Sequence, residues 1–159
     1  MRLRWLPLLA VALFASRGRA ADPSFVRVWP AWYGADEFKR ISEYFDGREN
    51  TGGRVIRRTH PDLREGYYFV VRVKNPGPAL AGTVFRLQVV TPSSADPRTF
   101  TFPADVPAGS QLYDLGLTGA DWAGEKIRPV AWKMELVAPD GRVVDARQSF
   151  LWAMPEPRS

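Results

Sequence analysis

The sequence predicts a mainly β protein, a single antiparallel β-sandwich that carries one short N-terminal amphipathic helix. Seven or eight short segments alternate apolar and polar residues, and Pro, Gly and Asp turns separate them, which is typical of antiparallel sheets. Only one segment has the spacing of a helix, whereas a parallel sheet needs a helix between successive strands. No internal repeat or linker divides the chain, so one domain is expected.

The first strand and the helix are expected near the start of this domain. Ser24–Pro30 alternates apolar and polar residues, and we expect the proline to close the strand. In the segment that follows, Asp36 is suited to cap a helix and Gly47 to stop it. The apolar residues between them recur at helical spacing, which predicts that the helix lies on a sheet. They are Phe38, Ile41, Tyr44 and Phe45.

The middle of the chain predicts three more strands. One surrounds Arg54–Thr59 and ends in a turn at Pro61 and Asp62. The other two lie in "YYFVVRVKNPGPALAGTVFRLQVV", Tyr67–Val90, with a Pro/Gly turn between them. We interpret these two as neighbours that share one polar side and one apolar side.

The polar side of these two strands raises the question of whether it binds a ligand. Its members are Arg72, Lys74, Arg86 and Gln88. We expect acids such as Glu135 and Asp145 on the polar side of the last hairpin. Mixed charges predict a solvated face, on which exposed ion pairs contribute about 0 to 1 kcal/mol each. A surface for an anionic ligand is the alternative.

The remaining strands are expected in the second half of the chain. Arg98–Pro103 alternates threonine with phenylalanine, and Ser110–Leu117 places every second residue, from Tyr113 on, on one apolar face. Ala131–Trp152 contains the clearest hairpin signal. Its Asp140-Gly141 pair stands where a tight turn needs positive φ.

Residues 1–20 have the pattern of a secretory signal peptide. A basic start precedes an apolar run, and small residues at Gly18 and Ala20 mark a cleavage site. We therefore expect a signal peptide over 1–20, a single β-sandwich domain over 21–159, and secretion of a bacterial protein into the periplasm or the extracellular space. The apolar run is about half of the roughly 20 residues that a membrane-spanning helix needs, so no stable membrane anchor is expected.

Charge and composition exclude several function classes. The whole chain has a net charge of +5, but after removal of the signal peptide 18 basic residues remain against 17 acidic ones, a net charge of +1. That balance argues against a nucleic-acid partner, which needs clustered positive charge. The chain has no cysteine, and His60 is its single histidine. We therefore expect no disulfide, no metal site and no cofactor.

One stretch carries a resemblance to a known group of domains. "FVVRVKNPG", a strand that ends in Asn75, Pro76 and Gly77 before "FRLQVV", resembles the second and third strands of bacterial immunoglobulin-like or fibronectin III-like accessory domains. The chain as a whole also resembles an uncharacterised family of secreted bacterial proteins. The resemblance implies an immunoglobulin-like sandwich, and it implies no activity.

Groups that could catalyse a reaction are sparse. His60 lies in a turn and is expected to be solvated, and none of the serines that could complete a triad lies in G-x-S-x-G. Asp114, Asp121 and Glu125 lie near Trp122 in the sequence, and two carboxylates across a cleft suffice for glycoside hydrolysis. We favour the interpretation in which Trp122 plugs the end of the sandwich, and we assign no catalytic residue.

Val28–Phe38 is the most aromatic segment and the natural place for a sugar-binding surface. Trp32 and Tyr33 are expected in a connection that leads from the first strand to the helix. A residue just before a helix cap commonly packs on the first turns. We therefore expect Trp32 to be mainly structural, packed on Phe38 and Ile41.

These observations favour a non-catalytic exported binding or accessory module with an unknown protein or glycan partner. The candidate ligand-binding residues are Trp32, Tyr33, Trp122 and Asp121. One alternative is a small secreted hydrolase that acts on carbohydrate through Asp or Glu. Another is a carbohydrate-binding domain whose exposed aromatic rings stack on sugars.

Overall fold

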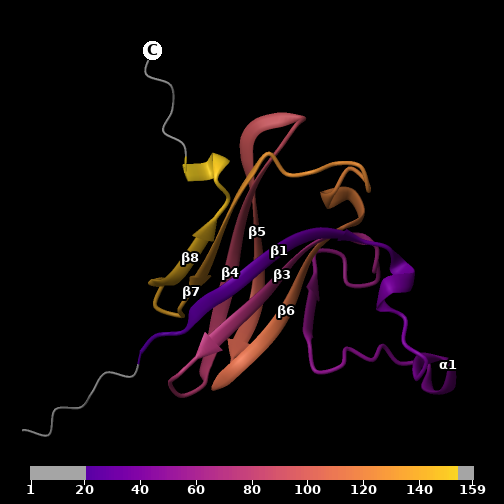
Figure 1. Ribbon diagram of the computed structural model, residues 1–159, viewed down its shortest axis with the longest axis horizontal. Helices are drawn as coiled ribbons and strands as arrows, with labels where there is room; N and C mark the ends of the chain where they lie inside the picture. Colours follow the sequence, from indigo (N-terminus) through magenta and orange to yellow (C-terminus); the bar gives the residue numbers. More distant parts are fainter. Residues whose placement is uncertain (1–20, 154–159) are drawn as a thin grey trace, which may run out of the picture.

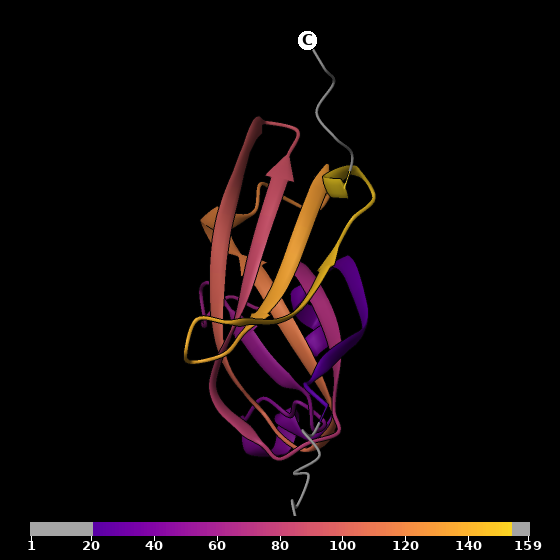
Figure 2. The same cartoon turned by 90° about the vertical axis from the view of Figure 1, so that its left-hand side faces the viewer.

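Residues 21–153, which the computed structural model describes, form two four-stranded β-sheets that pack on each other (Figure 1). The strands are β1 (Ser24–Tyr33), β2 (Val55–Arg58), β3 (Gly66–Asn75), β4 (Leu80–Thr91), β5 (Ser94–Val106), β6 (Gly109–Thr118), β7 (Ala131–Val137) and β8 (Val143–Gln148). Sheet A has the order β1-β3-β6-β2. Sheet B has the order β5-β4-β7-β8, and its strands are seen side by side in Figure 2. The predicted mainly β architecture of two packed sheets is confirmed.

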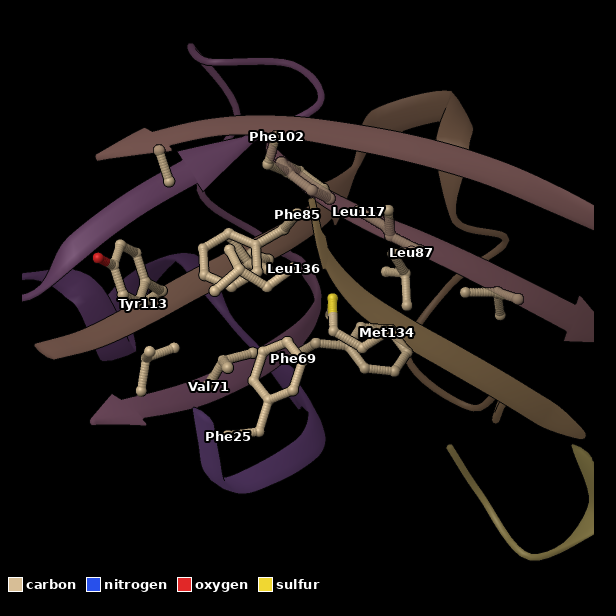
Figure 3. Close-up of a cluster of buried hydrophobic side chains, with 14 of the residues drawn as sticks. Phe25, Phe69, Val71, Phe85, Leu87, Phe102, Tyr113, Leu117, Met134 and Leu136 are labelled. Carbon is tan, nitrogen blue, oxygen red and sulfur yellow. The ribbon is translucent and has the colours of Figure 1, made fainter. Parts of the chain in front are cut away.

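An apolar core fills the space between the two sheets. In Figure 3, Phe69 and Val71 of β3 approach Phe85 of β4 and Met134 of β7, and all four side chains are fully buried. Phe85 also packs edge-on against Tyr113 of β6, with ring centroids 4.8 Å apart. Each such side chain contributes about 1.5 to 3 kcal/mol by its burial. The apolar face predicted for β6 is confirmed, because Tyr113, Leu115 and Leu117 all lie in this core.

The hairpin predicted near the C-terminus is also confirmed. β7 and β8 pair antiparallel, and Gly141 in the turn between them has φ of 84°. That dihedral lies in the left-handed region, where a side chain is disfavoured.

β3 and β4 are not neighbours in one sheet, so the shared face predicted for Tyr67–Val90 is wrong. β3 pairs with β1 and β6, whereas β4 pairs with β5 and β7. The turn between β3 and β4 carries the chain from one sheet to the other. Arg72 and Lys74 therefore lie on the outside of sheet A, and Arg86 and Gln88 lie on the outside of sheet B. Alternation shows which side of a strand is buried, but it does not show which strand lies beside it.

The first strand is longer than predicted, because Pro30 does not end it. β1 continues to Tyr33, and Pro30 pairs in register with Phe69 of β3. β1 is an edge strand, and a proline there removes no hydrogen bond that the sheet needs. Trp32 and Tyr33 thus belong to a strand and not to a connection.

One pair of strands departs from the antiparallel pattern that was predicted. β2 pairs with β6 in parallel, with Val55 opposite Tyr113 and Arg58 opposite Gly116. Parallel neighbours need a long connection between them. Here β3, β4 and β5 supply it, because they come between β2 and β6 in the chain.

The predicted amphipathic helix is wrong in its extent and in what its apolar side does. The segment contains a single 3-10 turn, η1 (Ala35–Phe38), and one helical turn, α1 (Glu43–Asp46), with extended backbone at Lys39 between them. Three of its four apolar residues do not lie on a sheet, since Ile41, Tyr44 and Phe45 are 78%, 81% and 86% exposed. The contact of Phe38 with Tyr68 and the polar contacts described below hold the segment. No helix in the described part of the chain is long and apolar enough to cross a membrane.

β3 is buried on both sides along its first half. Tyr67, Phe69 and Val71 face the core, while Tyr68 and Val70 face outward and are buried as well. The outward side is covered by the segment between β1 and β2. Phe38 of η1 packs on Tyr68 with ring centroids 4.8 Å apart, and Tyr33 packs on it edge-on at 5.7 Å.

Close packing of Tyr68 on β6 leads to a first prediction. A Cβ added at Gly116 would lie well inside contact distance of the Tyr68 ring. Gly116→Ala should therefore destabilise the protein by about 1 to 3 kcal/mol, since the ring has to move within a packed layer. Denaturant unfolding measures the change.

Gly34→Ala is the matched control for this prediction. A Cβ at Gly34 meets only the tip of Glu37, 3.9 Å away, and the backbone is extended with φ of −73°. This variant should stay within about 1 kcal/mol of the wild type. Equal stability of the two variants would show that the Tyr68 ring does not depend on a bare backbone at Gly116.

Candidate functional site

A pocket of about 670 Å³ opens at one end of the sandwich, where β1 ends and β3 begins. In Figure 1 this is the end marked by the orange 3-10 turn η2 (Gly119–Asp121) and by the C-terminal end of β1. The walls come from the end of β1, the turn before β3 and the chain that leaves η2. The lining residues are Trp32, Ala35, Asp62, Leu63, Arg64, Glu65, Gly66, Gly119, Trp122, Ala123 and Gly124.

Trp32 forms the aromatic wall of the pocket. It lies opposite Tyr67 in the β1–β3 register, and it is half-buried and packed against the core. The expected contacts of Trp32 with Phe38 and Ile41 are wrong. Tyr33 takes that place, since its ring lies 5.8 Å from that of Phe38 while Ile41 is exposed. β1 continues through both residues, so that one side chain faces the core and pocket and the next faces outward.

Trp122 closes the end of the core beside the same pocket. Its indole stacks on Tyr67 with ring centroids 4.5 Å apart and an angle of 23° between the planes. Only 7% of Trp122 is exposed, which agrees with its interpretation as a plug and leaves no open ring face for a ligand. Its Nε1 has no hydrogen-bond partner among residues 21–153.

Asp121 faces away from this pocket into a smaller one of about 310 Å³, which Trp122 and Ala123 separate from the first. Arg98 donates to the Asp121 carboxylate at 2.8 Å and to its carbonyl oxygen at 3.1 Å. His60 Nε2 lies 3.2 Å from the other carboxylate oxygen. His60 is thus paired with an acid and only half-exposed, where the sequence predicted a solvated side chain.

The carboxylates considered for hydrolysis do not converge. Asp114 lies on the outer side of β6, fully buried and 2.5 Å from Arg54. Burial raises the pKa of Asp114, and the adjacent Arg54 opposes that rise. Glu125 is exposed, and Asp121 is held by Arg98. Across the described residues no serine hydroxyl hydrogen-bonds His60, and no three His, Asp or Glu side chains group as metal ligands would.

The pocket brings together residues that the sequence analysis did not single out. Asp62 and Glu65 are exposed acids on its rim, and glycines form much of its wall. A Cβ at Gly66 would run into the backbone of Leu117, so β3 and β6 approach closely here. Glycine at the start of a strand was the available signal, because it often marks a close approach of two backbones.

The turn that forms one wall of the pocket is held by a chain of polar contacts. The Tyr68 hydroxyl donates to the carbonyl oxygen of Arg64 at 2.6 Å and accepts from Arg58 Nε at 2.7 Å. Both terminal nitrogens of Arg58 in turn donate hydrogen bonds to the Glu49 carboxylate, at 2.9 and 2.5 Å. The side chain of Arg64 also pairs with Glu43 of α1 at 2.8 Å. The segment on the outside of sheet A and the pocket wall are thus one connected unit.

Hydrogen bonds from Arg58 hold the pKa of Glu49 below its usual value, against the opposing effect of burial. For Arg58, burial favours the neutral form, but the hydrogen bonds with Glu49 and Tyr68 outweigh it and keep the pKa above its ordinary value. Burial raises the pKa of Tyr68. Glu49 and Arg58 are therefore both charged at neutral pH, and Tyr68 is neutral.

Comparison with family models, with curated proteins and with solved structures finds no match to this chain. Its function has to be inferred from the pocket and the surfaces themselves.

The Glu49–Arg58 pair predicts a specific dependence of stability on pH. Because the pKa of Glu49 is lowered from 4.5, the pair stabilises the fold above about pH 4.5, and this contribution is lost as the pH falls through the folded-state pKa. Glu49→Gln should cost about 1.5 to 3 kcal/mol at pH 7, and its difference from the wild type should shrink as the pH falls below 4.5. Denaturant unfolding at a series of pH values measures both limits.

Glu125→Gln is the control, because Glu125 is exposed and joins no ion pair within residues 21–153. Its curve should run parallel to that of the wild type. A constant offset between Glu49→Gln and the wild type from pH 7 to pH 3 would contradict the assignment of the acid-sensitive contribution to Glu49.

Proposed function

We propose that this protein is a non-catalytic, exported binding module whose ligand occupies the pocket at the end of the sandwich. The single observation that carries the proposal is the pocket itself. Its volume of about 670 Å³ is that of a small-molecule site, it is open to solvent, and a half-buried indole forms one wall. The signal peptide expected over 1–20 lies outside the described residues, and export to the periplasm or beyond remains part of the proposal.

An immunoglobulin-like topology is part of the same proposal. In that fold the first, second and fifth strands share one sheet, while the third, sixth and seventh form the other. If β1, β3 and β6 are taken as the first group and β4, β7 and β8 as the second, the strand orders agree, with β5 as an additional edge strand. β2 stands where the fourth strand would be, although it comes earlier in the chain. This order supports the resemblance of β3 and β4 to second and third strands.

A glycan is the ligand that the pocket suits best. An indole wall stacks on the apolar face of a sugar ring. Asp62 and Glu65 on the rim can accept hydrogen bonds from hydroxyl groups, and the exposed backbone at Gly119 borders the pocket. Of the four residues proposed from sequence, Trp32 offers the aromatic surface, and Trp122 lines the same pocket but is buried against Tyr67. Tyr33 packs under the outer segment, and Asp121 borders the smaller pocket.

The alternative function is a carbohydrate-active hydrolase, and the presence of Asp62 and Glu65 on one pocket is the observation that favours it. Purified protein should show no turnover of the glycans that it retains. Turnover of a retained polysaccharide that Asp62→Asn or Glu65→Gln abolishes would show that the module is an enzyme. Unchanged glycan after prolonged incubation supports the binding module.

Filling the pocket tests where the ligand binds. Ala123 is exposed and lines the pocket, so Ala123→Leu should weaken retention on a glycan array at least about tenfold by occupying the space. Its melting temperature should stay within a few degrees of the wild type, because surface substitutions change stability by only about 0.5 kcal/mol.

Ala120→Leu supplies the matched control, since Ala120 is exposed in η2 and does not line the pocket. It should bind like the wild type. Glycan retention that survives Ala123→Leu would place the ligand elsewhere on the molecule and overturn the pocket proposal.

A further inference from the structure

The outside of sheet A carries a strip of exposed basic residues at the end opposite to the segment that covers Tyr68. The strip consists of Arg27 and Trp29 of β1 and Arg72 and Lys74 of β3. The three cationic residues are exposed, and Trp29 is half-buried between them and the covered part of the sheet. We propose that this strip binds a linear acidic polysaccharide, as a second site separate from the pocket.

A β-bulge in β1 sets two arginines side by side. The register of β1 on β3 shifts between Phe25 and Arg27, so that Arg27 lies directly opposite Arg72. Without the extra residue Val26, Arg27 would turn toward the core. Bulges often re-aim a side chain at a functional site. Like charges directly opposite on paired strands destabilise a sheet, so a bound anion would stabilise this register.

Nothing within the described chain supplies that negative charge. Within residues 21–153 no carboxylate lies within ion-pair distance of Arg27, Arg72 or Lys74. Asp145, which reaches the same edge from β8, has both oxygens engaged by backbone N–H groups, from Phe25 at 2.6 Å and from Ala146 at 2.9 Å. The side chain of Arg147 adds a further cation beside Phe25.

Several basic residues elsewhere on the two sheets have acidic partners. Arg86, on the outside of sheet B, pairs with Glu135 at 2.6 Å, and Lys133 pairs with the same carboxylate at 2.6 Å. On the covered half of sheet A, Arg54 pairs with Asp114. Other basic residues, such as Arg40 and Lys126, also have no carboxylate within ion-pair distance among residues 21–153. The strip differs from them because its cations are clustered: Arg27 lies opposite Arg72 and both lie over Trp29, which points to a ligand that brings negative charge.

Trp29 holds the two guanidinium groups in place. Arg27 lies over its ring at 4.8 Å from the centroid, and Arg72 lies over it at 5.8 Å. Such contacts contribute little affinity by themselves at an exposed site, but they order a flexible side chain before a ligand arrives. The N–H edges of the guanidinium groups stay available for carboxylate or sulfate oxygens.

The surroundings of the strip favour a polysaccharide over a nucleic acid. Arg72 and Lys74 project from the same side of β3 about 7 Å apart, and Arg27 broadens the row. The covering segment over residues 36–50 holds five acids against three bases and borders the other half of the same face. Duplex DNA, with one charge per about 1.7 Å, would meet these acids, whereas a polymer with one charge per sugar can rest on the strip alone.

The test measures affinity of the mature protein at several salt concentrations for polygalacturonate, which carries one carboxylate per sugar, for heparin, which carries sulfates and a higher charge density, and for neutral dextran. The wild type should bind at least one of the two acidic polymers and not dextran. Arg27→Gln combined with Arg72→Gln should lower the affinity about tenfold or more and reduce the salt slope by roughly 1.5 to 2. Its melting temperature should equal or exceed that of the wild type, since a repulsion is removed.

Two single variants separate the effect of net charge on binding from the effect of position on the strip. Arg72→Gln and Arg48→Gln remove the same charge, but Arg48 follows α1, which lies away from β1 and β3 in Figure 1. Only Arg72→Gln should weaken binding, and Trp29→Leu should weaken it severalfold at constant charge. An equal loss of affinity with Arg48→Gln would show that only net charge matters and would overturn the proposed binding strip.

Equal affinity for duplex DNA, with the same dependence on Arg72, would overturn the polysaccharide assignment. Ala123→Leu should leave polymer binding intact, so the pocket and the strip can fail separately.

Discussion

The placement of Tyr68 on the outer side of β3 is the constraint from which the candidate functional surfaces follow. Its ring lies on the bare backbone of Gly116 and under Phe38, and its hydroxyl joins Arg58 to the carbonyl oxygen of Arg64. A tyrosine at this depth needs a partner for its hydroxyl, because an unpaired buried polar group costs about 1 to 3 kcal/mol. The partners that it finds come from β2 and from the pocket wall, so the outer segment, the sheet and the pocket are positioned together.

Sheet A is consequently divided into a covered half and an open half, and the two handle charge differently. In the covered half, Arg58 and Arg54 are matched by Glu49 and Asp114, as buried charges have to be. In the open half, Arg27 and Arg72 lie directly opposite each other, and both lie over the ring of Trp29. Water screens exposed charges well enough to permit this arrangement. The same screening means that stability does not explain it, and this is why the open half is a candidate for ligand binding.

Local patterns predicted those parts of the fold that depend on neighbours in the chain. The β7–β8 hairpin followed from a turn with Gly141, and the core face of β6 followed from alternation, because burial on one side of a strand is visible in its sequence. The prediction of an amphipathic helix on a sheet was wrong, since Ile41, Tyr44 and Phe45 have helical spacing but are exposed and pack on no sheet. The prediction that Pro30 ends the first strand was wrong, because the effect of a proline depends on whether its strand lies at the edge of a sheet.

The candidate site also combines features that the sequence shows with features that only the tertiary structure shows. By itself the sequence predicted a mainly β domain with an aromatic cluster near Trp32 and without a recognisable catalytic motif, since composition and period act within a few residues. Only the tertiary structure decided that Trp32 lines a pocket while Tyr33 does not, that Trp122 is buried on Tyr67, and that Arg72 has Arg27 and not Arg86 beside it. Strand pairing decides each of these. A strand's apolar side can be satisfied by either sheet, and the choice is made by packing between segments far apart in the chain.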